Sequence, residues 1–288
     1  MNERPRFSPK AALLISIVAV STASILIRMS KASSLAIAAY RLIFSTLILL
    51  PLFIHSGGHR RLRAASKKDI LTLMGVGIVL ALHFATWISS LSFTSVASSV
   101  IFVHVDPIFV AVVSHFVLKE RITRRRLLGI LIAFFGTTII ATGDLGFGET
   151  NLYGDMLALM GAVMLGIYIL SGRRMRQSLD LVSYVTPVYA SSAVVLTAAC
   201  ALIGTPLTLY PAREYLLFLA IAVVPMIFGH TIYNWALRYV EAPVVSISLL
   251  GEPVGATILA LLILKEVPSP LVLLGGAVTL LGIYVTAS

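Results

Sequence analysis

Apolar residues in the sequence form long, nearly uninterrupted stretches instead of alternating with polar residues. An α-helix needs about 20 apolar residues to cross the hydrocarbon core of a bilayer, which is about 30 Å thick. Ten stretches meet this requirement, and the loops between them are short. They cover roughly 10–29, 35–56, 69–91, 95–118, 126–143, 152–172, 182–204, 213–237, 242–264 and 269–287. The pattern predicts ten transmembrane helices and no separate soluble domain.

The residue pattern of these stretches favours helices over the strands of a transmembrane barrel. A barrel strand alternates apolar and polar residues, whereas a segment such as 127–141 is apolar on every face. Of the whole chain, 58% is hydrophobic and 12% is charged, and that charged fraction is about half that of a soluble domain. The single cysteine, Cys200, excludes a disulfide framework within one chain. We therefore predict an all-α polytopic membrane protein.

The first apolar stretch follows Arg4, Arg6 and Lys10, an arrangement that also occurs in secretory signal peptides. No small-residue cleavage site follows it, and Arg28 marks the far end of a full-length span. We expect this stretch to be the first transmembrane helix.

The second half of the sequence repeats landmarks of the first half at a constant distance of 146 residues. An acidic residue followed by proline occurs in both halves, as Asp106-Pro107 and as Glu252-Pro253. Further matching pairs are Leu91 and Leu237, Lys119-Glu120 and Lys265-Glu266, Leu127–Gly129 and Leu273–Gly275, and Gly136 and Gly282. A tandem repeat of apolar spans is typical of membrane transporters. We predict two five-helix halves, at 1–144 and 145–288.

Basic residues are concentrated in alternate loops of the predicted bundle. If the N-terminus is cytoplasmic, most of the 22 Lys and Arg residues fall on the cytoplasmic side. The opposite side carries Arg28, Lys31, Arg213 and Lys265, and Arg41 lies within a span. This asymmetry follows the positive-inside rule and predicts that both termini are cytoplasmic. The net charge of +10 therefore does not indicate nucleic-acid binding, since a nucleic-acid patch would not alternate loop by loop.

The charge pattern also gives the relative orientation of the two halves. Each half has an odd number of predicted spans, so the second half must cross the membrane in the opposite sense. The loop after Lys119-Glu120 contains four arginines, and its counterpart after Lys265-Glu266 contains none. We predict an inverted repeat, an architecture that places the substrate site near the midplane between the halves.

These features together resemble the EamA-type drug/metabolite transporter superfamily. The similarity rests on the ten helices in two inverted halves, on the acid-proline pair in the fourth helix of each half, and on the Leu-x-Glu motif that closes it at 118–120 and 264–266. It covers about 11–143 and 152–287. Arg41 in the second helix also fits the family, whereas Asp106 replaces its usual Glu and Pro187 stands at the position that matches Arg41.

Within the superfamily, the chain is most similar to bacterial exporters of aromatic and other neutral amino acids. The resemblance implies a secondary transporter in the bacterial cytoplasmic (inner) membrane that needs no cofactor. It implies alternating access to a central cavity between the repeats, with helices 3–4 and 8–9 rocking against helices 1, 2, 6 and 7. Helices 5 and 10 would brace the outside.

Other functions fit the sequence less well. An exporter of toxic organic cations or nucleosides is the alternative within transport. A membrane receptor or intramembrane enzyme is the alternative from another class. The sequence has no HExxH, GxSxG or Walker A motif, and Gly143-Asp144 lacks the partner motif of an intramembrane aspartyl protease. We therefore expect a protein that is not an enzyme and whose partners are a small-molecule substrate and the lipid bilayer.

Polar side chains within the spans are candidates for the substrate site, because such groups are costly in hydrocarbon unless they face a cavity or a partner. The candidates are His83, Trp87, His104, Tyr168, His230, Tyr233, Asn234, Tyr40 and Arg41. His83 and Trp87 are four residues apart and share a helical face. Histidines bonded to neighbouring helices, with Trp87 in an interfacial belt, are the alternative. Arg41 could bind a substrate carboxylate or could snorkel outward, but we favour a structural role for it.

The acid-proline pairs are candidates for movement or coupling. A proline within a helix removes a backbone hydrogen bond, so Pro107 and Pro253 mark hinges. Asp106 and Glu252 beside them serve either packing at the hinge, which we favour, or proton coupling.

Glycines recur every seven residues in the fifth span, at Gly129, Gly136 and Gly143, and again at Gly275 and Gly282. Small residues on one stripe let helices approach closely. We expect packing within a monomer in preference to a dimer interface.

Overall fold

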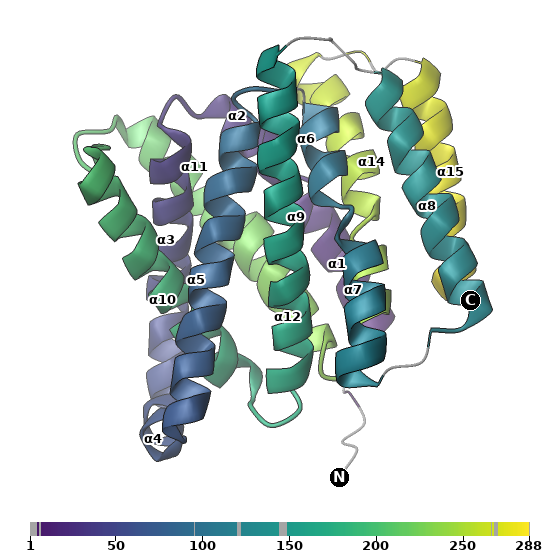
Figure 1. Ribbon diagram of the computed structural model, residues 1–288. Helices are drawn as coiled ribbons and strands as arrows, with labels where there is room; N and C mark the ends of the chain where they lie inside the picture. The colour runs from purple at the N-terminus through teal and green to yellow at the C-terminus, as the bar shows by residue number, and fades with distance from the viewer. Residues whose placement is uncertain are drawn as a thin grey trace.

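The computed structural model describes residues 5, 7–94, 96–119, 122–143, 149–265, 267 and 270–287. Within these ranges every regular element is a helix (Figure 1). The α-helices are α1 (Pro9–Val20), α2 (Ala23–Met29), α3 (Ser34–His55), α4 (Gly58–Ala64), α5 (Lys67–Ser90), α6 (Val96–Val103), α7 (Asp106–Val113), α8 (Arg124–Gly143), α9 (Glu149–Met175), α10 (Leu181–Ile203), α11 (Ala212–Ile221), α12 (Ile232–Ala236), α13 (Ala242–Ser248), α14 (Gly251–Leu259) and α15 (Pro270–Ala287). The π-helices in the described part of the chain are η1 (Ser114–Leu118), η2 (Ala222–Thr231) and η3 (Ala260–Leu264).

Consecutive helices join into rods that are long enough to cross a membrane. Among the described residues, eight rods meet the length and hydropathy of a membrane span. They are Pro9–Met29, Ser34–His55, Lys67–Ser90, Ser99–Val117, Leu152–Met175, Leu181–Ile203, Ala212–Ala236 and Ala242–Leu264. The other two predicted spans correspond to α8 and α15, which lie side by side at one edge of the bundle (Figure 1). The prediction of an all-α polytopic membrane protein is confirmed.

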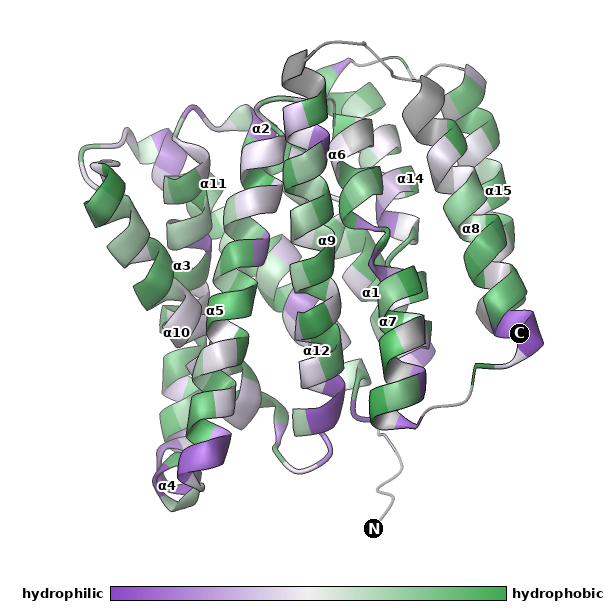
Figure 2. Cartoon of the chain, in the orientation of Figure 1, coloured by the Kyte–Doolittle hydropathy of each residue, from purple (hydrophilic) through white to green (hydrophobic). Residues whose placement is uncertain are grey.

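The outer surface of the bundle is apolar along its length. Leu14 is 65% exposed, Val18 70% and Val194 69%, although all three lie within predicted spans. Figure 2 shows hydrophobic residues covering the middle of the rods and hydrophilic residues gathered at their ends. A water-soluble protein rarely exposes so continuous an apolar surface, whereas a bilayer requires it.

The two ends of the bundle are closed by different polar contacts. At one end, Arg61 Nε lies 3.0 Å from Asp180 Oδ2, and Arg173 Nη1 donates to the carbonyl of Leu237 at 2.8 Å. At the other end, Arg28 Nη2 donates to the carbonyl of Thr94 at 3.0 Å, and the Ser30 hydroxyl donates to Glu214 at 2.5 Å. The basic segments that the sequence assigns to the cytoplasm therefore share one end.

Two rods are interrupted near the acid-proline pairs. The first breaks between α6 and α7, at His104 and Val105, and the second between α13 and α14, at Leu249 and Leu250. Each proline lies in the first turn of the helix after the break, where its missing N–H leaves no hydrogen bond unmade. The prolines thus start new helices beyond the break instead of kinking continuous ones.

Matching positions in the two halves share unusual backbone. The π-helices η1 and η3 lie 146 residues apart, and each is followed by a lysine with left-handed backbone, Lys119 (φ 56°) and Lys265 (φ 61°). Within a two-half organisation these segments are equivalent. The predicted boundary between residues 144 and 145 lies outside the described residues.

The glycine stripe lies where α8 packs against α15. A Cβ atom at Gly136 would lie 2.5 Å from the backbone nitrogen of Thr279, and one at Gly282 would meet the backbone of Ala133. Only glycine permits so close an approach of two helices. These two glycines therefore serve packing between helices of the same chain.

Candidate functional site

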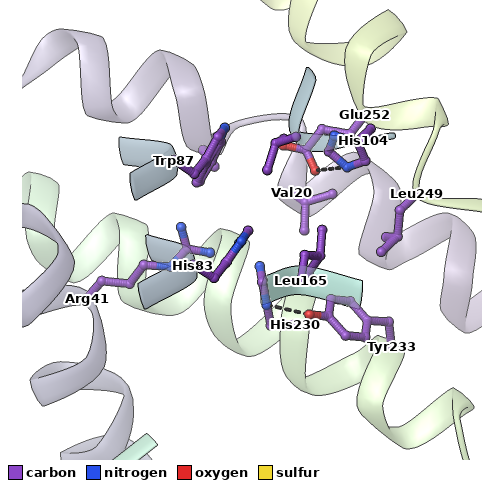
Figure 3. Close-up of a pocket in the computed structure, with 12 residues that line it drawn as sticks. Val20, Arg41, His83, Trp87, His104, Leu165, His230, Tyr233, Leu249 and Glu252 are labelled. Atoms are coloured by element: carbon purple, nitrogen blue, oxygen red, sulfur yellow. Dashed lines mark hydrogen bonds and ion pairs between the residues drawn. The ribbon is translucent and has the colours of Figure 1, made fainter. Parts of the chain in front are cut away.

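A small pocket lies in the middle of the bundle, where the interrupted rods meet the other helices. Its volume is about 20 Å³, enough for about one water molecule. It is lined by Val20, Ala23, Arg41, His83, Trp87, Val103, His104, Leu165, His230, Tyr233, Leu249 and Glu252 (Figure 3). Seven of these are polar or aromatic residues that the sequence singled out for the site or its hinge. Lining residues come from both halves of the chain.

His83 and Trp87 form one wall of the pocket. Their rings stack at a centroid distance of 6.0 Å with 8° between planes, as their spacing of four residues on α5 allows. His83 Nδ1 donates to the carbonyl of Gly161 on α9 at 2.9 Å. A Cβ at Gly161 would lie 3.2 Å from Trp87 Cβ, so the glycine lets α9 approach this wall closely. Trp87 is buried and lies in the pocket wall, not in an interfacial belt.

Arg41 enters the same wall from α3 and is fully buried. Its Cζ lies 4.1 Å from the ring centroid of Phe84, and its Nε lies 3.4 Å from Met226 Sδ. Nη1 and Nη2 have no hydrogen-bond partner among the described residues, and neither does Trp87 Nε1. The burial of Arg41 rules out snorkelling to the membrane surface. Several unpaired donors thus surround one side of the pocket, and a buried cation with no anion in hydrogen-bond contact is unfavourable.

His104 and Glu252 lie on the opposite side of the pocket and join the two halves (Figure 3). His104 Nε2 is 3.4 Å from Glu252 Oε2, and both side chains are buried. His104 Nδ1 donates to the carbonyl of Val100 at 2.7 Å, so this nitrogen carries a proton. The Nε2–Oε2 contact is attractive only if a second proton lies on one of its two atoms. The pair is therefore a place where a proton can be held.

Asp106 and Glu252 occupy matching positions, but their surroundings differ. Asp106 is buried outside the pocket lining, and Asp106 Oδ2 accepts a hydrogen bond from the hydroxyl of Ser246 on α13. Asp106 Oδ1 has no partner among the described residues. The contacts of His104 with Glu252 and of Asp106 with Ser246 both run between the first half and the second.

His230 and Tyr233 form the third side, with a distance of 2.6 Å between His230 Nδ1 and the Tyr233 hydroxyl. Asn234 and Tyr168 stand behind this side, since Asn234 Nδ2 donates to the Tyr168 hydroxyl at 2.9 Å and to the carbonyl of His230 at 2.6 Å. Neither of them lines the pocket. Asn234 and Tyr168 therefore support the pocket from behind its lining residues.

Tyr40 lies apart from the pocket. It stacks on Phe218 at 4.6 Å, contacts the rings of Tyr210 and Tyr215 edge-on, and donates a hydrogen bond to the carbonyl of Leu207. Successive residues on a helix point about 100° apart, so Tyr40 and Arg41 face different neighbours. Tyr40 belongs to an aromatic cluster at the end of the bundle that holds Arg28 and Glu214.

Sequence reasoning missed other residues around the pocket. Phe84 lies under the Arg41 guanidinium, and Ser246 is the partner of Asp106. The π-helix η2 carries His230 and contains Pro225. Proline within a span was a visible indication of irregular backbone there, and π-helical turns often occur at functional sites.

Comparisons with known proteins agree with this architecture. The sequence profile of the EamA-like transporter family matches twice, at residues 9–142 and 152–288. An uncharacterized transporter of Archaeoglobus fulgidus is 24% identical over 281 residues, covering 96% of this chain and 95% of that protein. The uncharacterized transporter YetK of Bacillus subtilis is 26% identical over 269 residues, covering 85% and 75%.

A protein of known crystal structure shares the fold, with a TM-score of 0.78 over 98% of both chains at 17% sequence identity. Because the family profile covers nearly the whole chain and the rods suit a bilayer, the protein is a multi-pass membrane transporter and belongs to the EamA-like transporter family.

Proposed function

We propose that the protein is a secondary transporter that exports small zwitterionic metabolites, with aromatic and other neutral amino acids as its first substrates. The observation that carries this proposal is Arg41, a fully buried guanidinium with two unpaired nitrogens at the wall of the central pocket.

The buried charge of Arg41 favours an anionic ligand. Removing the partner of a buried charge typically costs about 3–5 kcal/mol. A substrate carboxylate would bind the guanidinium in a bidentate fork, the arrangement for which arginine is best suited. Trp87 Nε1 would offer a further donor on the same side. Arg41 thus acts as the carboxylate site in this proposal.

Glu252 suits the ammonium group of the same substrate. It lies across the pocket from Arg41 (Figure 3), and among the described residues its one ion-pair contact is with His104. Val20, Leu165 and Leu249 supply apolar walls between the two charged sides. Such a distribution matches a molecule with a carboxylate, an ammonium and an apolar side chain. Stacking on Trp87 favours an aromatic side chain.

Transport by alternating access fits the size of the pocket. Small-molecule pockets measure about 300–1,000 Å³, whereas this one measures about 20 Å³. The helices must therefore separate before an amino acid enters. The rod breaks at His104-Val105 and Leu249-Leu250 lie at the pocket and provide hinges, with Asp106-Pro107 and Glu252-Pro253 beside them.

A proton held between His104 and Glu252 would couple transport to the pH gradient. An ammonium that binds Glu252 takes the position of that proton, so substrate and proton would compete for one carboxylate. Exchange of the two across the membrane drives export from the cytoplasm. The proposal includes two inverted halves, at 1–144 and 145–288. It also places both termini in the cytoplasm, since the basic loops share one end of the bundle.

Export of toxic organic cations or nucleosides is the second candidate, and the buried Glu252 favours a cation. A cationic substrate would, however, add a positive charge to a pocket that already holds Arg41. Neutral zwitterions avoid this conflict.

The test is uptake by sealed proteoliposomes of labelled phenylalanine, tryptophan, methionine, lysine, a nucleoside and a quaternary ammonium, with and without a pH gradient. Saturable flux of phenylalanine or methionine that responds to the gradient is the expected result. Flux of the quaternary ammonium alone would replace the amino-acid assignment with cation export. Absence of flux for every solute would refute the transport proposal for this panel.

A further inference from the structure

A second, larger cavity lies at the end of the bundle that holds the basic loops. Its volume is about 540 Å³, within the range of ligand-binding pockets. It runs between α1 and the starts of α8 and α13, with one residue from the end of α15. The lining residues are Lys10, Leu13, Leu14, Ile17, Arg126, Tyr239, Val240, Glu241, Val244, Ser248 and Ile283. We call this cavity the α1–α13 groove.

The groove has a basic mouth and an apolar interior. Lys10 is exposed and has no ion-pair or hydrogen-bond partner among the described residues. Arg126 is paired with Glu241, and Arg124 and Arg125 are exposed beside it. Glu241 thus offsets part of the basic charge but not the charge of Lys10. Farther in, Leu14, Ile17 and Val244 make the walls apolar.

The groove opens toward the bilayer, not toward the central pocket. Leu14 in its wall is 65% exposed, and Val18 on the next turn is 70% exposed. At its inner end α1 closes against α14, because a Cβ at Gly251 would lie 2.8 Å from Ile17 Cγ2. An occupant would therefore enter sideways from the membrane and would remain separate from the substrate site.

The depth of the groove matches the part of one leaflet that lies nearest the headgroups. Lys10 and Ile17 are seven residues apart, which is about 10 Å along a helix. Half of the hydrocarbon core is about 15 Å thick. A phosphate at Lys10 would thus lie at headgroup level while the beginning of an acyl chain lies along Leu14 and Ile17.

We propose that the α1–α13 groove binds an anionic phospholipid of the membrane leaflet on this side, with the phosphate at Lys10 and Arg126 and an acyl chain along Leu14, Ile17 and Val244. Basic pockets between transmembrane helices on the cytoplasmic side commonly recognise such headgroups. The lipid would contact α1 and α8 of the first half and α13 and α15 of the second. It is therefore a ligand shared by both halves. This proposal is independent of the transported substrate.

The test is native mass spectrometry of the full chain in detergent, with equal amounts of phosphatidylglycerol and phosphatidylcholine that carry the same acyl chains. The wild-type protein is expected to retain phosphatidylglycerol preferentially. One cation near the membrane surface contributes about 1 kcal/mol, so Lys10→Gln is expected to lower the retention of phosphatidylglycerol about fivefold. Lys68→Gln, an exposed lysine at the start of α5, is the matched control and should have no such effect.

A second pair of variants tests the apolar interior. Val244→Phe fills the groove and is expected to lower retention of both lipids, whereas Val194→Phe on the exposed face of α10 is not. Equal retention of the two lipids by the wild-type protein would overturn the proposal, as would equal effects of Lys10→Gln and Lys68→Gln. Displacement of the lipid by glycerol 3-phosphate at millimolar concentration would also overturn it, since the site would then bind phosphate without an acyl chain.

Discussion

Replacement of Arg41 by methionine separates a binding role from a structural one. Methionine keeps an apolar chain against Phe84 and Met226 but removes the guanidinium and its two unpaired nitrogens. If Arg41 binds the substrate carboxylate, each charge-assisted hydrogen bond contributes about 1.5–3 kcal/mol. Loss of even one bond is then expected to weaken phenylalanine binding about 10- to 150-fold.

The stability of the substrate-free protein is expected to change in the opposite direction. Arg41 is fully buried and its Nη1 and Nη2 have no partner among the described residues. Replacing a buried charge by an apolar group of similar shape is often neutral or stabilising by about 1–4 kcal/mol. We therefore expect the Tm of Arg41→Met without ligand to equal or exceed that of the wild type.

The assay is the shift in Tm of the purified protein with phenylalanine and with phenethylamine, which lacks the carboxylate. A ligand at 100 times its Kd stabilises the folded state by about 2.7 kcal/mol, so the loss of binding is readily measured. Arg41→Met should lose the response to phenylalanine and leave the response to phenethylamine unchanged. Equal losses for both ligands, together with a lower Tm of the free protein, would refute the carboxylate role and indicate a structural one.

Three further predictions concern other parts of the molecule. Glu252→Gln is expected to weaken phenylalanine binding about tenfold but to leave 3-phenylpropionate, which has no ammonium, unaffected; equal effects on both ligands would argue against an ammonium site. Gly136→Leu is expected to lower the free energy of unfolding by about 1–3 kcal/mol, because the new side chain would meet the backbone of Thr279. Gly75→Leu is the control, since Gly75 has open space around it and its replacement should not have this effect. Thermal unfolding of the two variants compares them. Burial raises the pKa of Asp180, but hydrogen bonds from Ser183 and the nearby charge of Arg61 outweigh it and lower the pKa below its usual range. Asp180 is therefore expected to stabilise the fold above the unfolded pKa of about 4 and to lose this effect as the pH falls through its folded pKa. Because its side chain is 41% exposed, solvent screening limits the effect to at most about 1 kcal/mol. Tm measurements of Asp180→Asn and wild type from pH 7 to pH 3 should show a difference in Tm that shrinks as the pH falls.

The sequence predicts the helices well, because apolar length alone decides whether a segment crosses a bilayer. The predicted span 182–204, for example, corresponds to α10 at Leu181–Ile203. Apolar length alone does not predict where a rod breaks, although the acid-proline pairs, which we expected to mark hinges, lie directly after two of the breaks. The segment 95–118 reads as one continuous span, yet it contains the break between α6 and α7, and 10–29 contains the junction of α1 and α2. Apolar residues suit a turn buried in protein as well as a helix, so hydropathy carries no trace of such breaks.

The site is predictable only where local spacing decides the geometry. The stacking of His83 on Trp87 follows from their spacing of four residues on one helix. Asp106 and Glu252 look equivalent in the repeat, but Asp106 binds Ser246 and only Glu252 lines the pocket. Their partners come from distant parts of the chain, and a repeat in sequence does not make the surroundings of its copies identical.

If Glu252 receives the substrate ammonium, as proposed, its contact with His104 means that the resting protein already occupies its own substrate site. Glu252 is held by a residue of the first half, and beside the pocket Asp106 is held in the same way by Ser246 of the second half. A solute would then have to displace His104 from Glu252 before it is held, and a solute without a cationic group would leave that contact intact. On this proposal, a molecule that fits the pocket but cannot replace the contact between His104 and Glu252 would bind without being transported.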